Sequence, residues 1–253
     1  MPAKYTASYS ASQNFLTSPK TIRRLIACTT IAKTNLVLEI GAGKGHITRT
    51  LLDACRAVTA YEIDPHLAQL LRENLGARAN LQLVPGDFLA APLPARGDYK
   101  VFSNIPFSIT TAIVRKLTAA PNLPKAMWLV VEKGAAKRFL GTPRETVMSL
   151  SLKPFFDLSI AYHLARTDFH PMPRVDCVLL HFARRDEPDI APAERAAFSA
   201  FVKEGAGRFL SKRQMGTALR RGNLPPACAS GEMLYVQWLC LFRCWRQFGR
   251  KLT

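Results

Sequence analysis

Acidic residues are scarce in this 253-residue sequence: 18 Asp and Glu face 35 Lys and Arg, which gives a formal charge of +17. An excess of this size favours a polyanionic partner, and nucleic acid is the usual one. A basic surface that only keeps the protein in solution is the alternative. Neither terminus carries a separate basic amphipathic segment, so an acidic membrane is disfavoured as the partner.

The sequence also lacks paired cysteines, long apolar runs and a targeting segment. Its six cysteines show no disulfide or zinc spacing, because Cys240 and Cys244 have no second pair to complete a metal set. Reduced thiols in the core are typical of cytosolic proteins. No stretch reaches the roughly 20 apolar residues of a membrane helix, and the first residues have no signal-peptide core. We therefore expect a cytoplasmic protein with no membrane partner and no metal site.

Hydrophobic residues make up 48% of the chain, enough for a sizeable core. Short β-rich runs alternate with helical patterns through the first 180 residues, and most of these runs are apolar throughout, as in parallel strands covered on both faces. The pattern predicts an α/β fold, with a doubly wound, Rossmann-like sheet of seven strands. The expected strands span 35–40, 57–63, 81–87, 99–105, 126–132, 155–165 and 177–184.

A charged, proline-containing stretch at 184–194 ends this alternation, and only helical periodicity follows it. We expect domains at 1–185 and 186–253, the second a small helical domain. Two apolar helical faces are predicted within it. One comprises Phe198, Phe201, Val202 and Phe209, and the other Leu234, Trp238, Leu241, Trp245 and Phe248.

The segment "LEIGAGKGHIT" (38–48) places a glycine-rich turn at the end of the first expected strand. Glycines such as Gly41 and Gly43 let the backbone turn sharply and approach a ligand at the carboxyl edge of the sheet. The spacing is not a dinucleotide fingerprint, because His46 replaces the third glycine, and no Ser or Thr follows Lys44 as in a P-loop. A plain strand-to-helix turn is the alternative.

Acidic residues end the next two expected strands: Glu62 in "YEID" and Asp87 in "PGDF". A carboxylate at the first position can accept both ribose hydroxyls of a nucleoside, and one at the second can accept from the exocyclic amine of adenine. No phosphate-binding group is needed. Together with the glycine turn, these residues predict a site for S-adenosylmethionine.

The fourth strand ends in Asn-Ile-Pro-Phe, at the same edge of the sheet. Two acceptors on the hydrogens of an aromatic amine, the Asn104 side-chain oxygen and the Ile105 carbonyl, would aim the nitrogen lone pair at a methyl donor. Pro106 restricts Ile105 to an extended conformation. Phe107 offers a face for a flipped base, and such stacking is worth about 1–3 kcal/mol. We therefore interpret Asn104, Ile105 and Phe107 as catalytic.

This ordered set resembles the ribosomal RNA adenine-N6 methyltransferases, and most closely the Erm-type enzymes that confer macrolide resistance. The resemblance covers about 170 residues, from "SQNFLTS" (12–18) to "FHPMPRVDCVLL" (169–180), and includes "NIPFSITTAIVRKL". It implies that the N-terminal segment closes over the cofactor. It also implies the cofactor contacts Gln13, Asn14, Leu16, Gly41, Gly43, Glu62, Asp87 and Asn104, with Asn104 and Phe107 on the target adenine.

The implied activity is methylation of the N6 amine of one adenine in 23S ribosomal RNA, either free or in early ribosome assembly. It would remove an amine donor and add bulk where macrolides bind. We expect a monomer. A housekeeping small-subunit adenine dimethyltransferase is the main alternative, but that branch commonly has Pro and Leu at Ala42 and Lys44. Two others are a non-catalytic RNA-binding protein on the same fold and a methyltransferase for DNA adenine or protein glutamine. Ile105, where the latter have proline, disfavours the last.

Overall fold

The computed structural model describes residues 14–226 and 232–249. The chain forms two compact units: residues 1–136 with 159–184, and residues 137–158 with 185–253. The second unit thus includes residues 137–158, which the sequence analysis grouped with the first domain. Among the described residues, no helix has the length and apolar character needed to cross a membrane.

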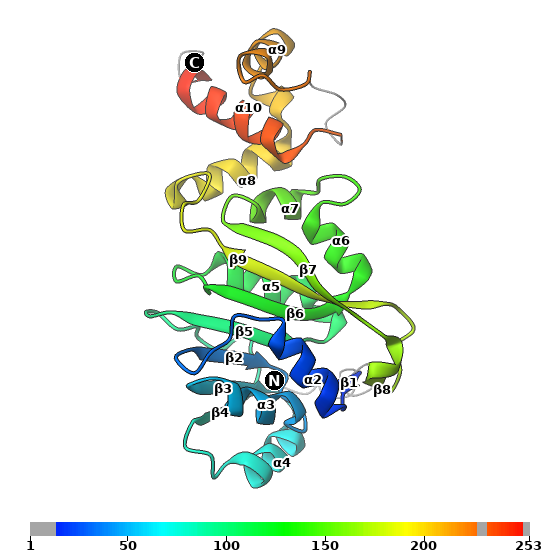
Figure 1. Ribbon diagram of the computed structural model, residues 1–253. Helices are drawn as coiled ribbons and strands as arrows, with labels where there is room; N and C mark the ends of the chain where they lie inside the picture. The colour runs from blue at the N-terminus through cyan, green and yellow to red at the C-terminus, as the bar shows by residue number, and fades with distance from the viewer. Residues whose placement is uncertain (1–13, 227–231, 250–253) are drawn as a thin grey trace, which may run out of the picture. The chain divides into compact units, whose positions relative to one another are not determined.

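The predicted seven-stranded α/β sheet is confirmed, in the order β4-β3-β2-β5-β6-β9-β7 (Figure 1). The pairs β2–β3, β3–β4, β2–β5 and β5–β6 are parallel, and β6–β9 is antiparallel. The strands are β2 (Leu36–Ile40), β3 (Ala57–Glu62), β4 (Leu81–Pro85), β5 (Tyr99–Asn104), β6 (Ala126–Glu132), β7 (Phe156–Leu164) and β9 (Cys177–Arg184).

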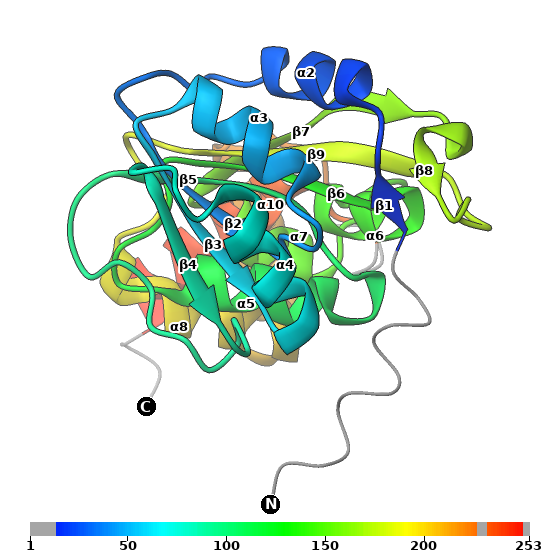
Figure 2. The same cartoon turned by 90° about the horizontal axis from the view of Figure 1, so that it is seen from below.

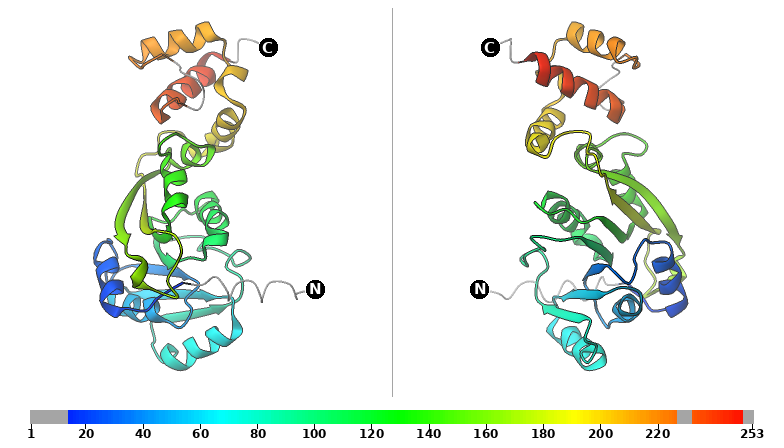
Figure 3. Two further views of the ribbon diagram at one scale, coloured as in Figure 1. Left: turned by 90° about the vertical axis from the view of Figure 1, so that its right-hand side faces the viewer. Right: turned by 60° about the vertical axis from the view of Figure 1, so that its left-hand side comes forward.

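Helices cover both faces of this sheet, as the apolar strands require (Figure 3, left). One face is covered by α2 (Pro19–Ala27), α3 (His46–Ala54) and α4 (Pro65–Leu75), which share one buried cluster with strand residues such as Val37 and Trp128. The opposite face is covered by α5 (Thr110–Ala119), which buries Ile113, Val114 and Leu117. The N-termini of α2 and α4 are determined by the local sequence. Ser18 and Asp64 are the N-cap residues of these helices, and a proline follows each of them.

Strands β2 and β5 separate at their carboxyl ends. Their pairing runs from Leu36–Tyr99 to Leu38–Val101, although both strands continue further. Beyond this point the Ser103 hydroxyl takes the place of the backbone hydrogen bonds between the two strands. It accepts from the Ile40 N–H (3.2 Å) and donates to the Ile40 carbonyl. The chain order reverses between these strands, and ligands of doubly wound sheets bind at such a switch point.

A second, two-stranded sheet holds the start of the described chain. Strand β1 (Phe15–Leu16) pairs antiparallel with β8 (Phe169–His170), and the two lie side by side in Figure 2. Two further bonds join α2 to the same region: the Thr21 hydroxyl donates to Asp168 (3.0 Å) and Arg24 donates to the Tyr162 hydroxyl (3.1 Å). Residues 15–16 and 169–170, which belong to the two ends of the resemblance, are therefore neighbours in space.

The remaining helices are α6 (Lys133–Leu140), α7 (Val147–Leu152), α8 (Arg195–Glu204), α9 (Lys212–Arg221) and α10 (Tyr235–Phe248). The short 3-10 turns are η2 (Phe107–Ile109), η3 (Arg166–Asp168), η4 (Pro192–Glu194) and η5 (Ala206–Arg208). In the second unit, aromatic rings fill the space between α8 and α10: Phe201 lies 5.6 Å from Phe242 and 5.5 Å from Trp245, measured between ring centroids.

Three details of the predicted helical faces were wrong. Phe209 is not on α8, because Gly205 (φ 86°) ends that helix, although its ring still lies 5.2 Å from Phe201. Leu234 precedes the first turn of α10 and Phe248 ends its last turn, and both are exposed. A helical pattern that is extended past the end of a helix predicts buried side chains at positions where the backbone is no longer helical.

The cysteines only partly follow the expectation of core thiols. Cys55 and Cys177 are buried, and burial raises their pKa values to about 11 and about 12. Cys28 is exposed just after α2, so it was wrongly placed in the core. Cys240 and Cys244 are half-buried on α10.

Candidate functional site

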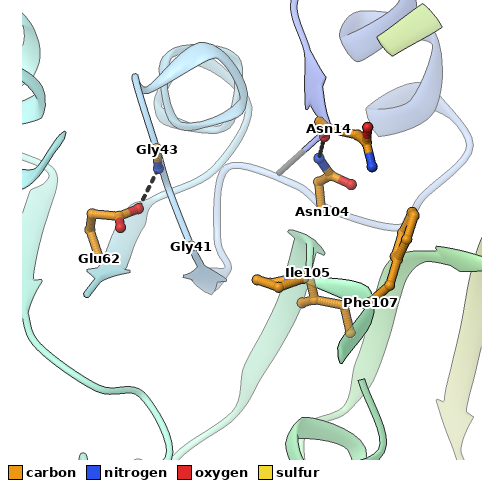
Figure 4. A pocket seen from close by; sticks show the side chains of 8 residues that line it. Asn14, Gly41, Gly43, Glu62, Asn104, Ile105 and Phe107 are labelled. Carbon is orange, nitrogen blue, oxygen red and sulfur yellow. Dashed lines mark hydrogen bonds between the residues drawn. The ribbon is translucent and has the colours of Figure 1, made fainter. Parts of the chain in front are cut away.

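Two small adjoining cavities lie at the carboxyl ends of β2, β3 and β5, where the strands separate. They share Gly41, Glu62 and Pro106, and have volumes of about 30 and 40 Å³. Asp87 lines the second cavity. The first brings together seven of the predicted residues (Figure 4): Asn14, Gly41, Gly43, Glu62, Asn104, Ile105 and Phe107.

Of the two remaining predicted residues, Leu16 and Gln13, only Leu16 is described by the structure. Leu16 is 2% exposed, belongs to the hydrophobic core and pairs with Phe169, and it lines neither cavity. Gln13 lies outside the described residues. The neighbour of Leu16, Phe15, is the residue that approaches the site: its ring would be 3.0 Å from a Cβ atom placed on Gly43.

The glycine turn needs its glycines for two reasons. Gly41 (φ 72°) and Gly43 (φ 57°) both adopt left-handed backbone conformations that disfavour other residues. At Gly43 a side chain would also crowd the Phe15 ring, whereas the nearest atom to a Cβ on Gly41 is Pro106 Cδ at 3.9 Å. The turn is thus covered by β1 at Gly43 and open toward Pro106 at Gly41.

Glu62 is held by the backbone on both sides. The Gly43 N–H donates to its Oε2 atom (2.6 Å) and the Asp64 N–H donates to its Oε1 atom (2.9 Å). Burial raises the pKa of this carboxyl group, while both N–H groups favour its charged form. A carboxylate has about four acceptor positions, so these two bonds leave acceptor capacity for ribose hydroxyls.

Glu39 is a buried carboxyl group for which the sequence analysis predicted no role. It is the last residue but one of the strand β2 (LVLEI), is 1% exposed, and its Oε2 atom has no hydrogen-bond partner among the described residues. Burial raises its pKa to about 8, and the neighbouring Glu62 charge acts in the same direction. The signal in the sequence was an acidic residue one position before the end of an otherwise apolar strand.

The Asn104 amide is oriented by the main chain of Asn14. Its Nδ2 atom donates to the Asn14 carbonyl oxygen at 2.7 Å. A carbonyl can only accept, so Asn104 must present its nitrogen there. Its Oδ1 atom is left pointing toward the Phe107 side of the pocket (Figure 4). The amide therefore offers the pocket its oxygen as an acceptor.

Ile105 and Phe107 complete this side of the pocket. The Ile105 side chain is buried (2% exposed), and Pro106 follows with φ −58°. Phe107 begins η2 and is half-buried, with part of its ring against the main hydrophobic cluster. Glu62 and Gly43 lie across the pocket from Asn104 and Phe107 (Figure 4).

The charges of the site suit a cationic nucleoside without phosphate. Within residues 14–226 and 232–249, Glu62 and Asp87 are the charged residues that line the two cavities, and no Lys or Arg lines either. Asp87 is exposed, and its Oδ1 atom accepts from the Leu89 N–H (2.8 Å). Among these described residues a phosphate would meet two carboxylates and no cation, whereas a sulfonium ion would be attracted by both. The residues present therefore fit S-adenosylmethionine.

Fold and site together define a Rossmann-like methyltransferase. The sequence profile described as "Ribosomal RNA adenine dimethylase" matches residues 5–206. An rRNA adenine N-6-methyltransferase of Lysinibacillus sphaericus is 34% identical over 94% of this chain and 96% of its own, and one of Escherichia coli is 31% identical over 95% and 97%. The chain belongs to the ribosomal RNA adenine dimethylase family.

Solved structures agree with this assignment. The 23S rRNA methyltransferase ErmE matches with a TM-score of 0.81 and 31% identity, over 92% of this chain and all of that one. A dimethyladenosine transferase of Plasmodium falciparum matches with a TM-score of 0.72 over 92% of this chain and 98% of that one, but at 19% identity, which supports the fold alone.

Proposed function

We propose that this protein transfers methyl groups from S-adenosylmethionine to the N6 amine of a specific adenine in 23S ribosomal RNA, and so confers resistance to macrolide-type antibiotics. The observation that carries the proposal is the oriented Asn104 amide, with its oxygen in a pocket that also contains Glu62 and the glycine turn. The similarity to ErmE and to the N-6-methyltransferases supports the choice of substrate.

The chemistry requires the site to make a poor nucleophile reactive. The Asn104 Oδ1 atom and the Ile105 carbonyl would accept the two hydrogens of the adenine amine and draw its nitrogen out of conjugation with the ring. S-adenosylmethionine would supply an electrophilic methyl group on its sulfonium ion, with the electrons of the carbon–sulfur bond left on sulfur. The amine nitrogen, held by these two acceptors, would take that methyl group, and the proton it loses would go to solvent. Orientation alone supplies roughly 7–11 kcal/mol in favourable cases.

The other residues of the site would hold the reactants. Glu62 would accept the ribose hydroxyls, Asp87 the adenine amine of the cofactor, and Phe107 would stack against the target base. Asn14 would hold Asn104 and contact the cofactor, and the assignments of Gln13 and Leu16 to the cofactor stay predictions. The enzyme would act in the cytoplasm as a monomer, on free 23S RNA or on an early assembly particle.

We also propose that the helical unit after residue 185 binds RNA. A groove of about 940 Å³ lies between α9 and α10 and has a partly apolar lining, including Ala218 and Leu239. Three arginines line it, and among the described residues none of them is ion-paired with a carboxylate: Arg213, Arg221 and Arg243. Arg243 donates to the Asp189 carbonyl (2.8 Å) and keeps further N–H donors. Guanidinium groups without a carboxylate partner beside an apolar surface suit phosphates and unstacked bases of RNA.

Transfer of labelled methyl groups to protein-free 23S RNA tests the activity. Asn104→Ala should lower kcat about 100-fold or more, in the range known for losing one group that stabilises a transition state. RNA affinity should stay within about twofold. Asn14→Ala is the matched control: it keeps the main-chain carbonyl that orients Asn104, so kcat at saturating cofactor should stay nearly unchanged, and a lost cofactor contact should appear only in the KM for S-adenosylmethionine. Equal kcat values for wild type and Asn104→Ala would contradict the proposal.

A further inference from the structure

Lys116 on α5 is bound to a turn beside the site by all of its donors. Its ammonium group donates to the carbonyl oxygens of Phe88 (2.7 Å), Leu89 (2.8 Å) and Ala91. An ammonium group has three N–H donors, and each of them finds a main-chain acceptor in the segment 88–91. The same ammonium group lies 5.0 Å from the centroid of the Phe88 ring.

The bound segment is the turn that follows Asp87. Leu89 donates its N–H to the Asp87 carboxylate (2.8 Å), so the turn is fixed from one side by Asp87 and from the other by Lys116. Burial lowers the pKa of Lys116 and the charge of Asp87 raises it. A long, flexible side chain held in this way loses rotamer freedom, and in return it fixes a turn that has no regular secondary structure.

This contact joins two segments that line the second cavity. Gly86, Asp87 and Phe88 line it from the turn, and Pro106 and Ile109 line it from the segment before α5. Ile109 is the residue immediately before α5, the helix that carries Lys116. The helix is therefore continuous with one part of the lining and is bonded through Lys116 to the turn that continues another.

We propose that Lys116 is a positioning residue that holds the Asp87 turn at the distance required to bind the adenine end of S-adenosylmethionine. The inference rests on the proposed function, because Asp87 must face the cofactor's adenine amine for this spacing to matter. Lys116 itself lines neither cavity and touches neither reactant. Its effect therefore passes through Asp87.

The variant Lys116→Met removes the ammonium group and keeps an apolar stem of similar length. Its affinity for S-adenosylmethionine, measured by calorimetry, should fall about tenfold, the loss expected for one misplaced hydrogen bond. The KM for the cofactor should rise by the same factor, while kcat at saturating cofactor stays within about twofold of wild type, because Asn104 is unaffected. Lys125→Met is the control: its ammonium group pairs with Asp98 on the surface (3.2 Å).

A double-mutant cycle with Asp87→Ala separates positioning from general stabilisation of the turn. In the Lys116→Met background, Asp87→Ala should cost little further affinity for S-adenosylmethionine. Lys116→Met should also show a smaller preference than wild type for the cofactor over its analogue without the adenine 6-amino group. The inference would be overturned if the loss of affinity in the double variant equalled the product of the losses in the two single variants. An unchanged affinity in Lys116→Met would overturn it as well. If that variant does not fold, Lys116→Arg serves in the same comparisons, with a smaller loss expected and unchanged affinity again decisive.

The proposed function fails in a different way. Wild-type protein that binds no S-adenosylmethionine would overturn both the function and this inference. Wild-type protein that binds the cofactor and methylates RNA, with Lys116→Met equal to it in affinity, would overturn the inference alone.

Discussion

At the residue scale, the site is built from polar side chains at the carboxyl ends of neighbouring strands. Glu62 and Asn104 are the last residues of β3 and β5, and Glu39 is the last residue but one of β2. The two glutamates are both buried, and burial raises the pKa of each. Glu62 is compensated by two N–H groups, whereas the Oε2 atom of Glu39 has no partner in the described chain. Glu39 is therefore the carboxyl group that favours its neutral form.

This difference predicts a pH dependence of stability. The ordinary pKa of a glutamate is 4.5 and that of Glu39 in the folded protein is about 8, so between these values the folded state keeps a proton that the unfolded chain has lost. The stability that this retained proton contributes is fully present below pH 4.5 and is lost as the pH rises to 8. The free energy of unfolding should fall in this window by up to about 1.4 kcal/mol per pH unit.

The variant Glu39→Gln cannot titrate, so its free energy of unfolding should lose this slope, and the variant should gain stability relative to wild type as the pH rises. Denaturant unfolding at pH 5, 6, 7 and 8 measures both quantities. Glu73→Gln, on the exposed face of α4, should leave the slope in place. Parallel curves for wild type and Glu39→Gln would show that Glu39 does not keep its proton.

The sequence was sufficient for residues whose role depends on a strand end. Gly41, Gly43, Glu62 and Asn104 were predicted in one crevice and line one cavity, since parallel strands all end at the same edge. Asn14, assigned through the family resemblance, lines it too. The Lys116 contact could not be predicted, because nothing local relates a lysine late in α5 to carbonyls 25 to 28 residues earlier.

At the element scale, the short pair β1–β8 ties the start of the described chain to the site. It positions Phe15 against Gly43 and places the Asn14 carbonyl on Asn104. The Thr21–Asp168 hydrogen bond (3.0 Å) joins the same two parts of the chain from α2. Closure of the site thus depends on residues 165–170, which line neither cavity.

The variant Thr21→Val removes this hydrogen bond and keeps the shape of the side chain. The KM for S-adenosylmethionine should rise about fivefold, as expected for about 1 kcal/mol of lost hydrogen bonding, with kcat nearly unchanged. Steady-state kinetics with varied cofactor measure both. Thr29→Val is the control, because its hydroxyl bonds only locally, to Ile26 and Ile31. Equal KM values for Thr21→Val and wild type would show that α2 is not needed for closure.

The sequence predicted the long elements better than the short ones. The strand 126–132 and the strand 177–184 were placed at their observed bounds. The two-residue strands β1 and β8 were missed, because no periodicity exists in two residues and their pairing joins distant parts of the chain. The antiparallel direction of β9 was likewise not predicted, since an apolar run buried on both faces does not reveal its direction.

At the scale of the whole molecule, the excess of positive charge is the feature that relates to the substrate. In the part of the chain that the structure describes, no basic residue lines either cavity, so the positive charges of these residues lie on surfaces outside the site. The α9–α10 groove, with Arg213, Arg221 and Arg243, is one such surface. The groove was not predicted from the sequence, because it forms between helices separated by a loop.

Replacing Arg213 and Arg221 together by Gln should weaken binding of 23S RNA and reduce the slope of log affinity against log salt by about 1 per lost phosphate contact. Affinity for S-adenosylmethionine should not change. Filter binding over a range of salt concentrations measures the slope. Arg220→Gln is the matched control on the same helix, since Arg220 bonds to Thr217 and does not line the groove. An unchanged slope in the double variant would contradict an RNA-binding role for the groove.

The central claim is methylation of one large-subunit adenine, and primer extension on ribosomal RNA tests it most directly. Two methyl groups on N6 leave no hydrogen for base pairing, so reverse transcriptase stops at that adenine. An adenine with a single methyl group is detected by digestion of the RNA to nucleosides and mass measurement. RNA from cells that produce the protein should show one modified 23S adenine, absent without the protein and with Asn104→Ala. Unmodified 23S RNA, or modification in small-subunit RNA instead, would contradict the account.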